Sequence, residues 1–175
     1  FGVGRAASIA AVQRAAASDG LLALITQRDP AKEQIDDEGD LYPVGVVARI
    51  TQIITPVEGG RRGGAMRVSV AVIDRFALET LDSDDNAVLA IGRIVKTERS
   101  VRDPDLDGLV SATHEEFMRF AEQPASSVSI DAAETAASIT DPGALADLIS
   151  IGPEMEVATR QRVLEALDPA ERLRI

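Results

Sequence analysis

Glycines near the start of the sequence have the spacing of a dinucleotide-binding fingerprint. Gly2, Gly4 and Ala7 fit the pattern G-x-G-x-x-A, and Asp29 follows the next apolar run. In such a site the glycines let a pyrophosphate approach the N-terminus of a helix, and the acid holds a ribose. The fingerprint also needs a strand before the first glycine and alternating strands and helices after it. Neither is evident here, so a nucleotide-binding enzyme that uses Gly2, Val3 and Gly4 is the alternative hypothesis.

Other motifs lack a residue that their chemistry requires. Gly59 and Gly64 have the spacing of a phosphate-binding loop, but Ala65 stands where a lysine must neutralise phosphate. His114 is the only histidine, and Met118 occupies the position of the second histidine of a zinc helix. With no cysteine and one histidine, the sequence offers no nucleophile paired with a base. We therefore expect no peptidase or ATPase activity, no cofactor and no metal in this chain.

Two groups of residues are candidates for contact with a substrate or partner protein. A helix predicted over residues 6–18 has a smooth, alanine-rich face where a solvent-facing helix usually carries Glu and Lys, and arginines cluster at a predicted hairpin. The first group is Ala7, Ala10, Arg14 and Ala17, and the second is Arg61, Arg62 and Arg67. Alternatively, another part of the protein covers the alanines, or the arginines only solubilise a loop tip.

The composition limits the classes of partner. A formal net charge of -11 opposes binding to phosphate backbones, because that affinity comes mainly from Lys and Arg, so nucleic acid is not an expected partner. The 45% of hydrophobic residues suffices for a core, but no apolar run approaches the roughly 20 residues that span a bilayer. The lack of cysteine permits a reducing compartment. We expect a soluble, cytoplasmic protein without membrane contact.

The first half of the chain predicts one helix and several β-strands. On a 3.6-residue period Ile9, Val12 and Ala16 share the helix face that we expect to be buried. Apolar, β-branched runs predict strands at residues 21–26, 44–54, 66–76 and 88–95. We expect the first of these to be buried on both faces. Strands joined by hairpins after one helix indicate a small antiparallel barrel or sandwich.

Charged segments separate the strands. Residues 28–40 predict an exposed loop, residues 56–64 a hairpin loop and residues 82–86 an acidic turn. In the strand predicted at residues 66–76, larger apolar residues alternate with polar or small ones, which is typical of a strand with one buried face. The positions expected on its buried face are Met66, Val68, Val70 and Val72.

After a polar stretch at residues 99–107 the apolar period becomes helical. Helices are predicted at residues 109–122, 130–139, 143–149 and 157–167. Asp141-Pro142 and Asp168-Pro169 have the residue types of an N-cap followed by the first helical position. These changes divide the chain into a β-rich part at 1–98 and an all-helical part at 107–175. Both ends of the sequence look cut, so we expect the helical part to be truncated at its C-terminal end.

Motifs of one known family occur in the same order along nearly the whole chain. In the first half they are Val3-Gly4-Arg5 with Ser8-Ile9, Leu24-Ile25 with Gln27, Asp40-Leu41-Tyr42, Val44 to Ile50, and Val72 to Phe76. In the second half they are Asp141-Pro142, Leu145-Ala146-Asp147, Gln161, Leu164-Glu165, and Asp168 with Glu171-Arg172-Leu173. The ordered set resembles the N-terminal, substrate-recognition domain of Lon-type ATP-dependent proteases. The resemblance is weak between residues 97 and 138.

This resemblance implies an α+β fold, in which a PUA-like antiparallel β pseudo-barrel with one helix precedes an all-helical bundle. Family members open with an additional strand before the Val-Gly-Arg segment, so we expect the first strand to be missing and an edge of the barrel to be unpaired. The implied function is non-catalytic recognition of unfolded, damaged or degron-bearing proteins for a hexameric protease. ATP, Mg and the Ser-Lys dyad of the parent serine endopeptidase would belong to other parts of the parent chain.

Two functions of a binding module remain open at this point. The chain could be a receptor for exposed apolar segments, with weak contacts strengthened by several copies in the parent. It could also be a scaffold whose helices aid assembly of the hexamer. Binding of an unfolded protein distinguishes the receptor from the scaffold, and affinity for ATP distinguishes the nucleotide-binding enzyme from both.

Overall fold

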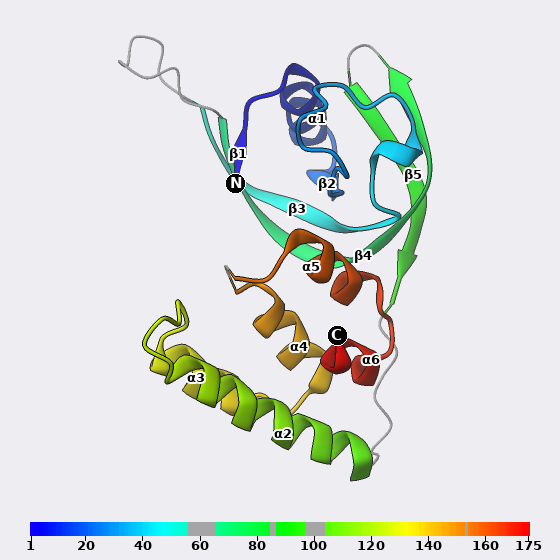
Figure 1. Ribbon diagram of the computed structural model, residues 1–175. Helices are drawn as coiled ribbons and strands as arrows, with labels where there is room; N and C mark the ends of the chain where they lie inside the picture. Colours follow the sequence, from blue (N-terminus) through cyan, green and yellow to red (C-terminus); the bar gives the residue numbers. More distant parts are fainter. Residues whose placement is uncertain (56–65, 85–86, 97–103, 153) are drawn as a thin grey trace. The chain divides into compact units, whose positions relative to one another are not determined.

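A computed structural model of the protein describes residues 1–55, 66–84, 87–96, 104–152 and 154–175 (Figure 1). The chain divides into two compact units, Phe1–Val95 and Lys96–Ile175. We call them the β unit and the helical unit. Every described strand and one α-helix belong to the β unit, and the remaining α-helices belong to the helical unit. The expected α+β class is confirmed.

The β unit is built on one antiparallel sheet of five strands. The strands are β1 (Gly2–Val3), β2 (Leu21–Leu24), β3 (Val44–Ile54), β4 (Met66–Asp84) and β5 (Ala87–Val95). Their order is β1-β4-β3-β2, and β5 also pairs with β4. β4 is the longest strand, with 19 residues, and it pairs with β1, β3 and β5 along different parts of its length. The strand pattern follows the β-branched runs, because such side chains pack well on a pleated surface.

Irregularities in strand pairing bend the sheet. The register between β3 and β4 shifts at Val47/Ala48 and at Ile50/Gln52, and the register between β4 and β5 shifts at Leu78/Thr80. Such bulges bend a strand and increase its twist. In Figure 1 the sheet curves, and α1 (Ala6–Ala16) lies within that curve.

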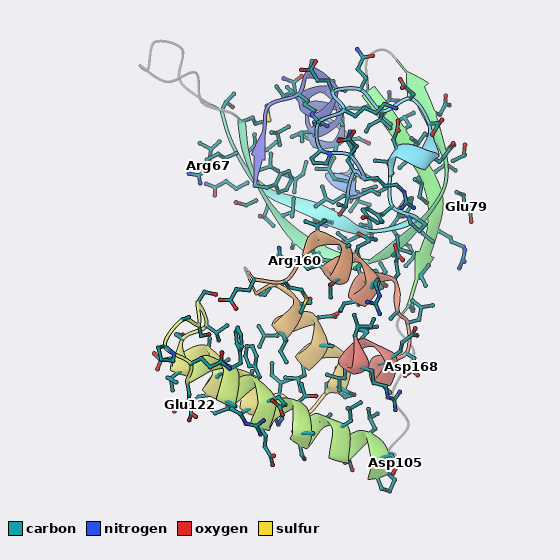
Figure 2. The ribbon with its side chains drawn as sticks, viewed as in Figure 1. Arg67, Glu79, Asp105, Glu122, Arg160 and Asp168 are labelled. Carbon is teal, nitrogen blue, oxygen red and sulfur yellow. The ribbon has the colours of Figure 1, made fainter. Side chains whose placement is uncertain are left out.

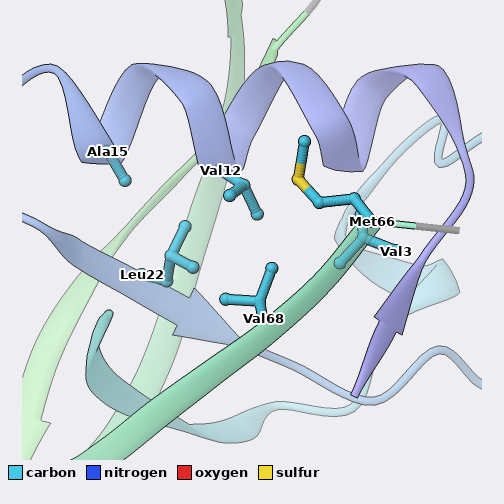
Figure 3. Close-up of a cluster of buried hydrophobic side chains, with 6 residues drawn as sticks. All are labelled: Val3, Val12, Ala15, Leu22, Met66 and Val68. Carbon is cyan, nitrogen blue, oxygen red and sulfur yellow. The ribbon is translucent and has the colours of Figure 1, made fainter. Parts of the chain in front are cut away.

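The core of the β unit lies between α1 and the concave face of the sheet (Figure 3). Its buried side chains are Val3, Val12, Ala15, Leu22, Met66 and Val68. Ile9 and Val12 lie on the core side of the helix, as expected, but Ala16 is exposed and Ala15 is buried in its place. Ala15 and Ala16 lie three and four residues after Val12, and the helix ends at Ala16.

Several expectations for the strands are corrected. The predicted strand at 21–26 is shorter and is not buried on both faces, because Leu22 is buried and Ala23 is exposed. Val72, which was expected on the buried face, is 62% exposed, and a register shift lies directly beside it. The expected acidic turn at 82–86 is a continuation of β4 through Asp84, and residues 85–86 lie outside the described part.

A strand at the very start was not predicted from the sequence. Gly2 pairs with Arg67 and Val3 with Met66, and the Val68 amide donates to the Phe1 carbonyl at 2.9 Å. Gly2 therefore lies in an antiparallel strand, and Gly4 lies just after the end of that strand. A dinucleotide site instead needs glycines in the turn that follows a strand of a parallel sheet, so the geometry does not support the nucleotide-binding alternative.

The helical unit contains α2 (Pro104–Ala121), α3 (Ile130–Ala137), α4 (Pro142–Ser150), α5 (Val157–Glu165) and α6 (Pro169–Arg174). The two predicted caps are confirmed. The Asp141 carboxylate accepts the Ala144 amide at 2.7 Å, and the Asp168 carboxylate accepts the Ala170 amide at 2.9 Å. Each cap satisfies an amide that has no partner within its helix.

The helices pack on a small core of Val110, Ala136 and Leu145. His114 of α2 is half-buried, with its Nε2 atom 3.0 Å from the Ile139 carbonyl oxygen. This contact joins α2 to Ile139, the second residue after α3. The histidine therefore has a packing role that its neighbours in the sequence do not reveal.

Candidate functional site

Two hollows of about 260 and 490 Å³ lie between α1, β2 and β5. They share five lining residues: Ala11, Ala23, Ala87, Val88 and Ala90. Because these residues are small, the lining leaves room for a chain to approach the backbone closely. We call the joined hollows the α1 groove.

The α1 groove lies between two ends of the sheet. Among the described strands, β2 pairs only with β3, and β5 pairs only with β4. Both of these strands line the groove. An edge strand offers backbone amides and carbonyls to an additional extended chain. The groove therefore combines small apolar side chains with sheet edges that can add a strand.

The loop between β2 and β3 forms another wall of the larger hollow through Glu33, Gln34, Ile35 and Leu41. Lys32 holds this loop together, because its Nζ atom lies 2.8 Å from the Asp36 carboxylate and 2.6 Å from the Asp40 carboxylate. These hydrogen bonds raise the pKa of Lys32, and the Lys32 contact lowers the pKa of Asp40.

Glu38 ties the same loop to β4. Its carboxylate accepts the Thr80 hydroxyl at 2.6 Å and the Leu81 amide at 2.7 Å, and Leu81 lines the groove. The two bonds, the Thr80 bond foremost, lower the pKa of Glu38. Because the pKa values of Glu38 and Asp40 are depressed, their ties are complete at neutral pH and are lost as the pH falls through those lowered values.

Arg5 fixes the end of the groove beside the start of α1. Its guanidinium donates to the Gln27 side chain and, at 2.9 Å, to the Pro30 carbonyl. Arg5 also lines the larger hollow. The groove wall is thus held by side-chain contacts to α1 and to β4.

The structure brings only part of the predicted contact set into this groove. Ala7 lines the larger hollow and Arg14 the smaller one. Ala10 is half-buried and Ala17 is exposed, and neither lines the groove. Arg67 is exposed on β4 and points away from the sheet (Figure 2). Arg61 and Arg62 lie outside the described residues.

Sequence reasoning missed the residues shared by the two hollows. Ala11 lies four positions after Ala7 and so belongs to the same helix face, which was a usable signal. Ala23, Ala87 and Ala90 gave no comparable signal, because they meet α1 only through the curvature of the sheet.

The lining of the groove contains small apolar side chains together with charged ones such as Arg5 and Glu33. In the part of the chain that the structure describes, no group of three or more His, Cys, Asp or Glu could hold a metal ion. None of the helices within the described ranges is long and apolar enough to cross a membrane.

Two solved structures of similar fold are both N-terminal domains of Lon proteins. The N-terminal domain of Lon protease from the Mycobacterium avium complex matches with a TM-score of 0.71 at 22% identity, covering 99% of this chain and 84% of that one. The Lon N-terminal domain protein from Xanthomonas campestris matches with a TM-score of 0.59 at 13% identity, covering 99% and 84%. These likenesses show a shared fold.

Sequence comparisons show the family. The Lon protease of Heliobacterium modesticaldum is 32% identical over 179 residues, which cover 99% of this chain and 20% of that protein. The Lon protease of Bacillus thuringiensis is 30% identical, covering 98% of this chain and 20% of that protein. The chain thus spans about a fifth of the length of these relatives. The family model of the ATP-dependent protease La (LON) substrate-binding domain matches residues 1–175. The chain belongs to the family of Lon substrate-binding domains.

Proposed function

We propose that this chain recognises unfolded or degron-bearing proteins and presents them to a Lon-type ATP-dependent protease. The observation that carries the proposal is the match of the substrate-binding family model to residues 1–175. In this proposal the parent is a cytoplasmic hexamer. ATP, Mg and a Ser-Lys dyad act in other parts of that parent, and this chain takes no catalytic step.

The α1 groove supports the proposal with a physical mode of binding. An unfolded segment is extended, has unpaired backbone groups and exposes apolar side chains. The sheet edges at β2 and β5 can pair with its backbone, and the alanines of the groove can contact its side chains. Such contacts are weakly sequence-specific, which suits a receptor for many substrates.

The test is the affinity of the chain for a permanently unfolded, labelled protein, measured by fluorescence anisotropy. In one variant Ala7→Glu is combined with Ala11→Glu, which places charge inside the groove. In the matched variant Ala10→Glu is combined with Ala17→Glu, which adds the same charge to α1 outside the groove. We expect the first variant to bind about tenfold more weakly and the second to bind nearly as the parent chain does.

Each outcome of this test is informative once circular dichroism has shown that the variants fold. If only the variant at Ala10 and Ala17 loses affinity, the binding site lies on the outer face of α1 and not in the groove. If both variants bind the unfolded protein as tightly as the parent chain does, α1 is not part of the binding site. If the parent chain does not bind unfolded protein at all, the receptor function is wrong and the scaffold function replaces it.

A further inference from the structure

A separate pocket of about 440 Å³ opens within the helical unit, between α2, α4 and the turns that follow these two helices. Its apolar walls are Phe117, Phe120, Val128, Ile149 and Met155. The volume lies in the range of about 300–1,000 Å³ that is usual for ligand pockets. Such a pocket can take one or a few apolar side chains.

Hydrogen bonds between separate segments give this pocket its shape. The Glu154 carboxylate accepts the Ser127 amide at 3.0 Å, which joins the turn after α4 to the turn after α2. Arg160 of α5, labelled in Figure 2, donates to the Gly152 carbonyl at 2.7 Å. The turns that carry Ser127, Gly152 and Glu154 are therefore positioned before any ligand binds, which lowers the entropic cost of binding.

Part of the apolar wall is not used by the core of the unit. Phe117 and Ile149 pack against the core cluster. Phe120, Val128 and Met155 are half-buried and lie outside that cluster. An apolar side chain that covers these three would be removed from water together with them, which is favourable in proportion to the area buried.

The charged groups of the pocket are acidic. Glu116 and Glu154 line it, and no Lys or Arg is among its lining residues in the described part of the chain. Glu116 contacts Arg119 at 2.6 Å, but both side chains are more than 60% exposed, so the pair is weak and an incoming cation can compete with it. In the helical unit as a whole, Asp and Glu outnumber Lys and Arg by two to one.

We infer that this pocket binds an apolar side chain from an unfolded protein segment in which Lys or Arg flanks that side chain. The inference rests on the proposed substrate-binding function and adds the class of segment. Apolar contact supplies affinity, and the carboxylates of Glu116 and Glu154 select basic neighbours. A second copy of this chain is a poor occupant, because its net charge of -11 repels the acidic rim.

The first experiment tests the pocket wall, with the whole chain and two labelled peptides. The peptides share a core of Phe, Leu and Ala, and one has Lys on both sides while the other has Glu. We expect Phe120→Ala to weaken binding of both peptides about tenfold. The control is Ile151→Ala, which truncates a side chain that is 70% exposed and does not line the pocket. If Phe120→Ala does not fold, Met155→Ala replaces it, and amide chemical-shift changes at Val128 and Gly152 report the contact directly.

The second experiment tests the charge preference. Glu116→Gln with Glu154→Gln keeps the acceptor for the Ser127 amide and removes both charges. We expect this variant to bind the Lys-flanked peptide about two- to fivefold more weakly, with no loss for the Glu-flanked peptide. Glu115→Gln with Glu134→Gln removes the same charge from exposed positions outside the pocket and should leave both affinities unchanged.

The outcomes separate this inference from the function on which it rests. If folded Phe120→Ala and Met155→Ala bind both peptides as the parent chain does, the pocket is not a binding site, even if unfolded protein still binds elsewhere. If the parent chain binds both peptides equally, the charge preference is wrong. If it binds neither these peptides nor an unfolded protein, the proposed function itself is lost.

Discussion

The side chain of Arg172 contacts several separate segments of the helical unit. It is 3% exposed, and its Nε donates to the Ala166 carbonyl at 2.8 Å while Nη2 donates to the Leu167 carbonyl at 3.3 Å. Nη1 lies 3.4 Å from the Asp147 carboxylate. Gly143 makes room for this group, since a Cβ there would lie 3.0 Å from Nη1. A planar guanidinium serves acceptors in several fixed directions, which a lysine ammonium cannot reproduce.

We therefore expect Arg172→Lys to lower the free energy of unfolding by about 2–4 kcal/mol, because buried carbonyls lose their donors. Arg174→Lys is the matched control: this neighbouring arginine is exposed, and its replacement should change stability by less than about 0.5 kcal/mol. Urea denaturation followed by circular dichroism measures both variants. If the two variants unfold at the same urea concentration, the Arg172 contacts contribute nothing to stability.

At the scale of elements, Gly20 shapes the turn that follows α1. The Gly20 amide donates to the Ala15 carbonyl at 2.9 Å, and its φ of 75° lies in the left-handed region that glycine adopts without strain. The chain then enters β2 at Leu21. This turn brings β2 back beside α1 and so creates one side of the α1 groove.

We expect Gly20→Ala to destabilise the protein by about 1–2 kcal/mol, since a Cβ disfavours the left-handed conformation. Gly4→Ala is the control, because an added Cβ there meets no atom within 4 Å and its backbone is not left-handed. Thermal unfolding of the two variants makes the comparison. A Gly20→Ala variant as stable as the Gly4→Ala variant would show that this turn relaxes without cost.

At the scale of the whole molecule, each compact unit has its own buried cluster, one around Val68 and one around Leu145. Brief trypsin digestion should therefore cut first within residues 99–107 or in the loop at residues 28–40. The loop should be as well protected at pH 5 as at neutral pH, because the lowered pKa values of Glu38 and Asp40 keep both carboxylates charged over this range and their ties to the loop intact. Mass spectrometry of the earliest fragments checks this, and early cleavage within Val68–Val72 would contradict the placement of β4.

The sequence by itself determined the features that depend on neighbouring residues. The alanine-rich helix, the β-branched strand at Val44–Ile54 and the Asp-Pro caps at Asp141 and Asp168 were predicted and are present. Helix propensity, strand alternation and capping act over a few residues, so a short window of sequence contains their cause. The ordered family motifs added the fold class.

Only the tertiary structure decided which residues meet from distant parts of the chain. The pairing of Gly2 with Arg67, the exposure of Val72 beside a register shift and the meeting of Ala11 with Ala23 and Ala87 follow from how the sheet bends. The same holds for Glu154 and Ser127 at the pocket of the helical unit. Register shifts and helix packing are set by long-range contacts that no local pattern encodes. The surfaces proposed to bind substrate are therefore visible only in the folded chain.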